Sequence, residues 1–218
     1  MATTVSMTNI LANNGKGWFP AQRGNCTWQL SSITPGDGAA SSIKIIPSGA
    51  GEVTLTSAAH ALVASHKYYV TFKIRFEAAV TGTCDWYWPV AEPAAAAGMA
   101  VNAAAGAWTR LSAAFDRTSF ADGSYYCRFD YNNNDGGNKT FWFTSCMLID
   151  LTAAFGAGLE PSKEWLDKHI TAFSDSPSVD YIDNLDELFA GISSAIQTKS
   201  GQPGKIFACD FIDKILAL

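Results

Sequence analysis

Apolar and polar residues alternate along several short stretches of the chain. The clearest case is residues 67–77, KYYVTFKIRFE, in which every second position from Tyr68 to Phe76 is apolar and the positions between them are mostly polar. Successive side chains of a β-strand point to opposite faces, so a period of two predicts a strand with one face buried against a second sheet.

Stretches of this kind recur from the start of the chain to about residue 151, and clusters of Gly, Pro, Asn and Asp separate them. Such spacing is typical of an antiparallel sandwich or barrel. The predicted strands are residues 5–12, 26–30, 42–46, 52–55, 67–77, 83–90, 108–115, 124–131 and 140–151. The last is apolar on both faces, which predicts a central strand. The Ala-rich residues 91–108 are interpreted as a loop or a weak edge segment.

Beyond Pro161 the apolar period lengthens to about 3.6 residues, which predicts helices. The first begins at Pro161 and Ser162 and runs to about residue 173, with Trp165, Ile170 and Phe173 as its apolar members. Two more follow within residues 178–218, and their apolar stripes are the candidate assembly interface: Leu185, Leu188, Ile192, Ile196, Phe211 and Ile215. Helices this small have little core of their own, so they need the sandwich, each other or a partner chain.

The sequence therefore predicts a mainly β fold in three parts. Residues 1–152 form a jelly-roll-like antiparallel β-sandwich, residues 153–177 an exit turn with a short helix, and residues 178–218 a small helical docking region. The exit turn contains Gly156 and Gly158, which invite comparison with a phosphate-binding loop. The turn lacks the third glycine of GxGxxG and any GK[ST], so the glycines are interpreted as positions that need unusual backbone angles.

Charge and composition limit the kinds of partner that the chain is expected to bind. A net charge of -5 gives no basic field to attract phosphates, so nucleic acid is not an expected partner. The chain has no run of about 18 consecutive apolar residues and no signal-peptide pattern, so we expect no membrane span and a mature chain that starts at Met1. The five cysteines lack metal-binding spacing and are expected to be buried and reduced; a Cys127–Cys146 disulfide between predicted neighbouring strands is the less favoured alternative.

Motifs for catalysis or metal binding are scarce. The three histidines stand in no HExxH pattern, and GxSxG is absent, so the sequence predicts a protein that is not an enzyme. Asp130, Asn132 and Asn134 place oxygen side chains at alternate positions, as at the start of a Ca²⁺ loop. The glycine comes one position late and Phe141 stands where Glu is needed. A polar hairpin loop is therefore favoured over a structural Ca²⁺ site, and no cofactor is predicted.

Aromatic residues supply the candidate glycan-binding positions. Trp86 and Trp88 share one face of their strand, and Tyr87 lies on the other. Sugar rings stack on exposed aromatic side chains, although most aromatic residues of strands fill the core. The core is favoured for Trp86 and Trp88, and Tyr87 and Tyr131 are the better surface candidates.

Two segments in the last third of the chain resemble phage proteins. Residues 147–167, MLIDLTAAFGAGLEPSKEWLD, are similar to the signature IDLTATFGAGNEP-T/S-K-E found at the end of carbohydrate-binding-like β-sandwich modules in bacteriophage tail and other virion proteins, with Leu159 where Asn is usual. Residues 195–218 resemble a phage-protein motif of the form AI-x-x-K-T/S-G followed by I-x-x-x-D-x-x-x-x-I.

The resemblance implies a virion component that is assembled in the bacterial host cytoplasm. We expect a non-enzymatic structural protein, either a capsid decoration or a tail-associated protein, that displays the sandwich outward. Its expected partners are other virion proteins and further copies of itself, with a trimer as the assumed oligomer. A host adhesin that binds a bacterial surface glycan is the alternative, and a glycoside hydrolase is the second alternative.

Overall fold

A computed structural model of the chain describes residues 3–12, 20, 22–49, 51–89, 95–133 and 139–181. The chain divides into two compact units, one formed by Ser6–Ser178 and the other by Met1–Val5 with Val179–Leu218. The predicted helical stripes of residues 178–218, from Leu185 to Ile215, lie outside the described residues.

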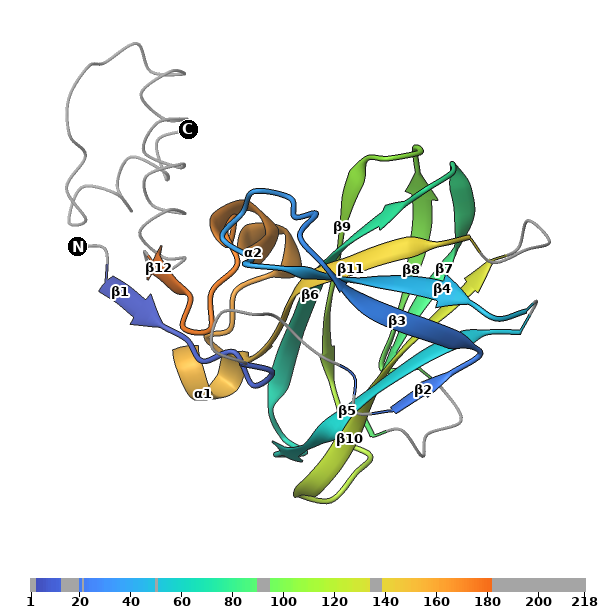
Figure 1. The fold of residues 1–218 in the computed structure, drawn as a ribbon. Coiled ribbons are helices and arrows are strands. Elements are labelled where there is room, and N and C mark those ends of the chain that lie inside the picture. The colour runs from blue at the N-terminus through green and yellow to red at the C-terminus, as the bar shows by residue number, and fades with distance from the viewer. Residues whose placement is uncertain are drawn as a thin grey trace, which may run out of the picture. The chain divides into compact units, whose positions relative to one another are not determined.

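The larger unit is a sandwich of two five-stranded sheets (Figure 1). The β11 sheet has the order β3 (Cys26–Ser31), β4 (Ser42–Pro47), β11 (Phe141–Asp150), β6 (Lys67–Phe76) and β9 (Trp108–Asp116). The β10 sheet has the order β2 (Gln22–Gly24), β5 (Val53–Leu62), β10 (Gly123–Asn133), β7 (Val80–Tyr87) and β8 (Ala97–Ala103). Neighbouring strands are antiparallel, and the chain passes repeatedly from one sheet to the other, as in a jelly roll. The predicted fold class is confirmed.

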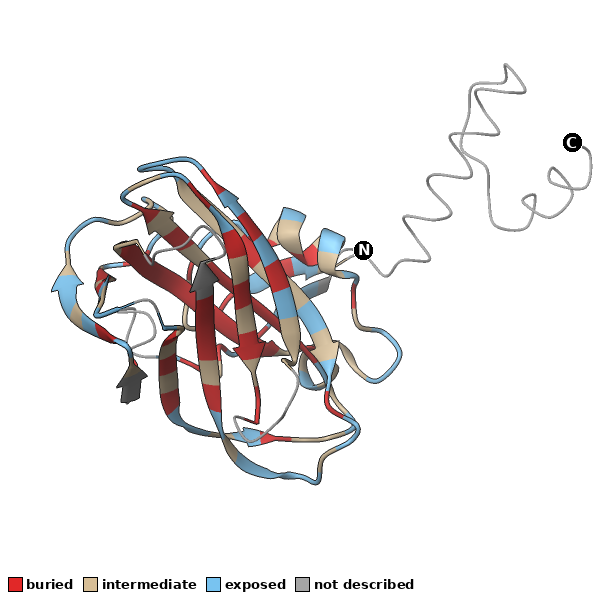
Figure 2. Ribbon diagram, turned by 90° about the vertical axis from the view of Figure 1, so that its right-hand side faces the viewer, coloured by how far each residue is buried: buried red, intermediate tan, exposed pale blue. Residues whose placement is uncertain are grey.

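The core lies between the sheets and is rich in aromatic rings. The inward-facing set predicted for β6 is confirmed, because Tyr68, Phe72 and Phe76 are at most 1% exposed. The ring of Phe72 lies 5.1 Å from that of Phe143 in the same sheet and 5.3 Å from that of Phe129 in the β10 sheet. Buried residues alternate with less buried ones along several strands in Figure 2, such as β7 and β8, as a period of two requires, whereas β11 is buried almost throughout.

Part of the β11 sheet is covered by two short helices that follow β11: α1 (Leu151–Phe155) lies against β6 and α2 (Lys163–His169) against β9 (Figure 1). Under this cover the outward-facing Tyr69 and Thr71 of β6 are also buried. Helix α2 buries Leu166 and is followed by the buried Ile170 and Phe173, so this part of the chain uses the sandwich to cover its apolar stripe. No helix among the described residues has the length and hydrophobicity needed to cross a membrane.

Local signals explain where these helices begin and end. The side chain of Ser162 accepts a hydrogen bond from the Trp165 backbone N–H at the start of α2, as an N-cap residue does. Helix α1 ends at Gly156, whose φ is 94°, and Gly158 has a φ of 80°. These left-handed angles favour glycine and confirm the interpretation of both positions.

Several strand boundaries differ from the prediction. The first strand is β1 (Thr3–Ser6), which pairs with β12 (Ser178–Tyr181), and residues 7–12 are not a continuous strand. The buried side chain of Asn9 there accepts hydrogen bonds from the backbone N–H groups of Leu11 and Leu148. Strand β5 runs well beyond its predicted end because its small residues hide the alternation, and the Ala-rich segment contains the edge strand β8.

The cysteines of the described residues are buried and form no disulfide: Cys26, Cys84, Cys127 and Cys146. The prediction that Cys127 and Cys146 lie on neighbouring strands was wrong, because β10 and β11 belong to opposite sheets. Their thiols point into the core between the sheets, where both residues are 0% exposed.

Candidate functional site

Three of the four aromatic residues predicted as candidates lie in the core. Trp86, Trp88 and Tyr131 are each 0% exposed. Each ring meets a ring of the opposite sheet: Trp86 meets Phe72, Trp88 meets Tyr68 at 4.8 Å, and Tyr131 meets Phe76 at 5.0 Å. This agrees with the favoured interpretation of the two tryptophans and corrects the surface position expected for Tyr131. Tyr131 has the same strand phase as the core residue Phe129, which decides its face.

Tyr87 reaches the outer face of the β10 sheet, where it is half-buried. The guanidinium of Arg128 lies 4.2 Å from the centre of its ring, and Arg128 Nη2 is 2.7 Å from Asp130 Oδ2. The ring therefore already has a cationic partner within the chain.

The carboxyl group of Asp130 is buried on this face, with 1% exposure. Burial raises its pKa to about 6, while the neighbouring Arg128 opposes the shift and the acidic Glu52 and Asp85 add to it. The carboxyl group of Asp130 is thus paired with the guanidinium of Arg128. Within the described part of the chain no cluster of three or more His, Cys, Asp or Glu side chains could hold a metal ion. The side chains of Asn132 and Asn134, the other predicted Ca²⁺ ligands, are outside the described residues.

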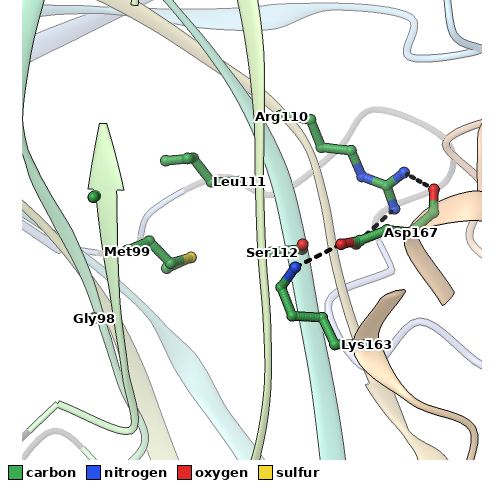
Figure 3. A pocket seen from close by; sticks show the side chains of 8 residues that line it. Gly98, Met99, Arg110, Leu111, Ser112, Lys163 and Asp167 are labelled. Atoms are coloured by element: carbon green, nitrogen blue, oxygen red, sulfur yellow. Dashed lines mark hydrogen bonds and ion pairs between the residues drawn. The ribbon is translucent and has the colours of Figure 1, made fainter. Parts of the chain in front are cut away.

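A cavity of about 410 Å³ lies at the flank of the sandwich, between the edge strands β8 and β9 and helix α2. We call it the flank cleft. Its lining residues come from these three elements: Gly98, Met99 and Ala100 from β8, Arg110, Leu111 and Ser112 from β9, and Lys163 and Asp167 from α2. Figure 3 shows Met99 and Leu111 on the β8 side of β9, and Arg110, Lys163 and Asp167 on the side of α2. Met99 and Leu111 are buried and give the cleft an apolar part.

The polar side of the flank cleft is a connected hydrogen-bond network. Lys163 Nζ donates to Asp167 Oδ2 over 2.6 Å, and the two residues face each other because they stand four positions apart on a helix. The Tyr69 hydroxyl donates to Asp167 Oδ1 over 2.6 Å. Arg110 donates to the Tyr69 hydroxyl oxygen over 2.7 Å and to the Asp167 backbone carbonyl over 2.9 Å.

Protonation in this network follows from the contacts. Burial raises the pKa of the Asp167 carboxyl, but hydrogen bonds from Lys163, Ser112 and Tyr69 outweigh burial, so the pKa ends below its ordinary value. Burial and the hydrogen bond to Asp167 raise the pKa of the Tyr69 hydroxyl. At neutral pH Asp167 is therefore an anion and Tyr69 a neutral donor, and the network is a set of fixed donors and acceptors.

The sequence did not single out the flank cleft. One signal was present: Tyr69 is a large aromatic residue on the otherwise polar face of KYYVTFKIRFE, which indicates that something covers that face. Lys163 and Asp167 also stand at helical spacing after a helix start. The pairing of Arg110 with α2 joins positions 57 residues apart, and no local pattern indicates it.

The fold is that of a jelly-roll-like β-sandwich. No protein-family model matches the chain, and no curated protein matches it. Solved structures with a similar strand arrangement include the carbohydrate-binding module of lichenase 5A from Cellvibrio mixtus in complex with cellotriose (14% identity, 66% of this chain, 98% of that chain, TM-score 0.41) and a family 16 carbohydrate-binding module (16% identity, 65% of this chain, 100% of that chain, TM-score 0.42). The enzymatically active domain of tailspike protein 4 of bacteriophage CBA120 also matches (13% identity, 64% of this chain, 21% of that chain, TM-score 0.43). The similarity concerns the strand arrangement alone.

Proposed function

We propose that the chain is a non-enzymatic virion protein of a bacteriophage that uses its sandwich to bind a bacterial surface glycan. The observation that carries the glycan-binding role is the flank cleft, in which buried Met99 and Leu111 lie beside the fixed polar groups of Ser112, Lys163 and Asp167. This moves the candidate glycan site from the predicted Tyr87 and Tyr131 to the flank of the molecule.

The composition of the flank cleft suits a sugar. A sugar ring presents C–H groups that prefer apolar surface and hydroxyl groups that both donate and accept hydrogen bonds. Met99 and Leu111 can meet the first, and Ser112, Lys163 and Asp167 the second. The volume of about 410 Å³ is at the lower end of ligand pockets, which span roughly 300–1,000 Å³, so the site accommodates a short stretch of a glycan.

The cleft also borders the edge strand β8, which pairs with β7 on one side only among the described residues. Alternate backbone N–H and C=O groups of an edge strand point away from its neighbour. Gly98, Met99 and Ala100 of this strand line the cavity, so we expect its outward backbone groups to add donors and acceptors of fixed position for hydroxyl groups.

The virion role is supported by the resemblance of residues 147–167 and 195–218 to segments of phage virion proteins. In this proposal the stripe from Leu185 to Ile215 joins the chain to other virion proteins or to further copies, and assembly takes place in the host cytoplasm. Deleting residues 182–218 should leave a folded sandwich that fails to enter particles. Normal incorporation of the truncated chain would refute the docking role.

Glycan binding is tested with an array of bacterial polysaccharides and two variants of one strand. Ala100 is exposed and lines the flank cleft, whereas Asn102 is exposed two positions along β8 and does not line it. Ala100→Trp should fill the cleft and abolish binding, and Asn102→Trp should retain it. If binding survives Ala100→Trp, the glycan site lies elsewhere on the protein. If the wild type binds no polysaccharide, the glycan-binding role is refuted and a decoration role remains.

One observation favours the hydrolase alternative. Asp85 and Asp130 stand directly opposite each other on β7 and β10, and burial raises the pKa of both carboxyl groups. We nevertheless propose no catalysis, because Asp130 is 1% exposed and faces Arg128, so a substrate does not reach it. The test is release of reducing ends from capsular and cell-wall polysaccharides. Release that Asp85→Asn abolishes would overturn this proposal.

A further inference from the structure

The net charge of the residues that line the flank cleft is opposite in sign to the net charge of the chain. Arg110, Lys163 and Asp167 line the cleft, which amounts to two cations and one anion. The chain as a whole has a net charge of -5. A locally positive concave site in an acidic protein favours a ligand group of negative charge.

Arg110 is not the group that meets such a ligand, because its guanidinium is committed to the scaffold. Its Nε donates to Thr71 Oγ1 over 2.9 Å, its Nη1 to the Asp167 carbonyl over 2.9 Å and its Nη2 to the Tyr69 hydroxyl oxygen over 2.7 Å. These bonds hold β6, β9 and α2 together. Arg110 therefore contributes a positive charge to the cleft and fixes the position of α2.

Asp167 already has a hydrogen-bond partner on each carboxylate oxygen. Its Oδ1 accepts from the Tyr69 hydroxyl and its Oδ2 from Lys163 Nζ, and Arg110 Nη2 lies 3.8 Å from Oδ1. A carboxylate held by donors from three sides is neutralised locally. It therefore repels an approaching anion less than an isolated carboxylate would.

Lys163 is the cation that remains accessible. An ammonium group has three N–H donors, and among the described contacts Lys163 Nζ is bonded to Asp167. The Lys163 side chain lines the cavity and is 38% exposed. Figure 3 shows it reaching from α2 toward Asp167 and Ser112, on the side of the cleft opposite β8.

The opposite end of the cleft has the other sign. Asp85 Oδ1 lies 3.1 Å from the position that a Cβ atom on Gly98 would occupy, so a carboxyl group stands beside the β8 end although it does not line the cavity. A ligand with one negative end would therefore lie with that end toward α2 and its uncharged end toward Gly98.

From this arrangement, and resting on the proposed function, we propose that the flank cleft recognises a sugar that bears a carboxylate. The carboxylate pairs with Lys163, and the C–H face of the sugar ring lies against Met99 and Leu111. The ligand class is thus an acidic glycan whose repeating unit contains a uronic acid or another carboxylated sugar.

The test compares acidic sugars with their uncharged counterparts. Oligosaccharides of glucuronic acid and of galacturonic acid, and the same oligosaccharides after reduction of their carboxyl groups, are titrated into the full chain by calorimetry. We expect the acidic forms to bind about tenfold more tightly at low ionic strength, the difference between a charged and a neutral hydrogen bond. The advantage should shrink at roughly 1 M salt, where the screening length is about 3 Å.

Substitutions in α2 test whether this difference in affinity depends on Lys163. In Lys163→Gln the ratio of the two affinities should fall to about one, and in Lys163→Arg, which keeps the charge, the preference for the acidic form should persist. Lys168→Gln, an exposed lysine of the same helix that does not line the cleft, should behave as the wild type. Circular dichroism of each variant checks that it is folded.

The outcomes separate the two proposals. Equal affinity of acidic and reduced oligosaccharides, with both lost in Ala100→Trp, would overturn the acidic-sugar inference and leave glycan binding standing. A preference for acidic sugars that persists in a folded Lys163→Gln variant would also overturn the inference. Failure of all four oligosaccharides and of the polysaccharide array to bind would overturn the proposed function and this inference with it.

Discussion

The hydroxyl of Tyr69 on β6 donates a 2.6 Å hydrogen bond to Asp167 Oδ1 on α2. Tyr69 is 0% exposed, so this bond joins the buried outer face of the sandwich to a helix that follows it in the chain. Arg110 on β9 donates to the same hydroxyl oxygen. The wall of the flank cleft that carries Lys163 and Asp167 is therefore positioned by a residue that does not line the cleft.

Tyr69→Phe should lower stability while the fold persists. The change removes one acceptor of Arg110 and one donor of Asp167 and leaves the ring in place, so we expect a loss of about 1–3 kcal/mol in the free energy of unfolding. Urea unfolding followed by fluorescence measures it. Tyr126→Phe is the control, since Tyr126 is 52% exposed, and its effect should be within about 0.5 kcal/mol. Equal effects of the two changes would contradict the role given to Tyr69.

Asp130 should make stability depend on pH in an unusual direction. Its pKa in the folded chain is raised to about 6, so the folded state binds a proton more tightly than the unfolded state. The contribution to stability is present below the ordinary pKa, near 4, and is lost as pH rises through about 6. Thermal unfolding of the wild type and of Asp130→Asn between pH 4 and 7 should show the wild type losing stability relative to the variant as pH rises. A carboxyl carbon signal in NMR that titrates near pH 4 and is absent from Asp130→Asn would contradict this prediction.

Tyr131→Ala should destabilise the fold strongly. Its ring contacts Phe76 and Phe141 in the core, and removing a buried aromatic ring costs about 3–5 kcal/mol. The exposed Tyr126→Ala is the matched control and should cost far less. Denaturant unfolding measures both. If Tyr131→Ala weakened glycan binding without loss of stability, the assignment of Tyr131 to the core would be wrong.

The buried thiols should be inert in the native protein. Burial raises the pKa of Cys84, Cys127 and Cys146, and the reactive thiolate is then scarce. Cys209 lies outside the described residues, so the measurement uses Cys209→Ser. In this variant an aromatic disulfide reagent should release almost no colour from native protein and should react with four thiols after denaturation. Rapid reaction of the native variant would contradict the burial of these residues.

The sequence alone was sufficient for the fold class. Period-two alternation in β6 and two-sided hydrophobicity in β11 are local properties, because burial of a strand face acts on each alternate side chain. Other local signals predicted the start of α2 at Ser162 and the unusual backbone angles of Gly156 and Gly158. Strands made of small residues, such as β8 and the second half of β5, were missed or shortened because Ala, Ser and Thr give a weak signal in either phase.

The position of the candidate site was decided by tertiary structure. The alternation showed that Trp86 and Tyr87 lie on opposite faces of their strand. Which of the two faces is buried depends on the sheet that packs against it. The flank cleft joins β8, β9 and α2, and its contacts link residues far apart in sequence. Local sequence patterns reflect interactions between residues that are close in sequence. A cleft is formed by strands and helices that packing brings together from distant parts of the chain. For this reason Arg110, Lys163 and Asp167 were recognised as neighbours only in the folded chain.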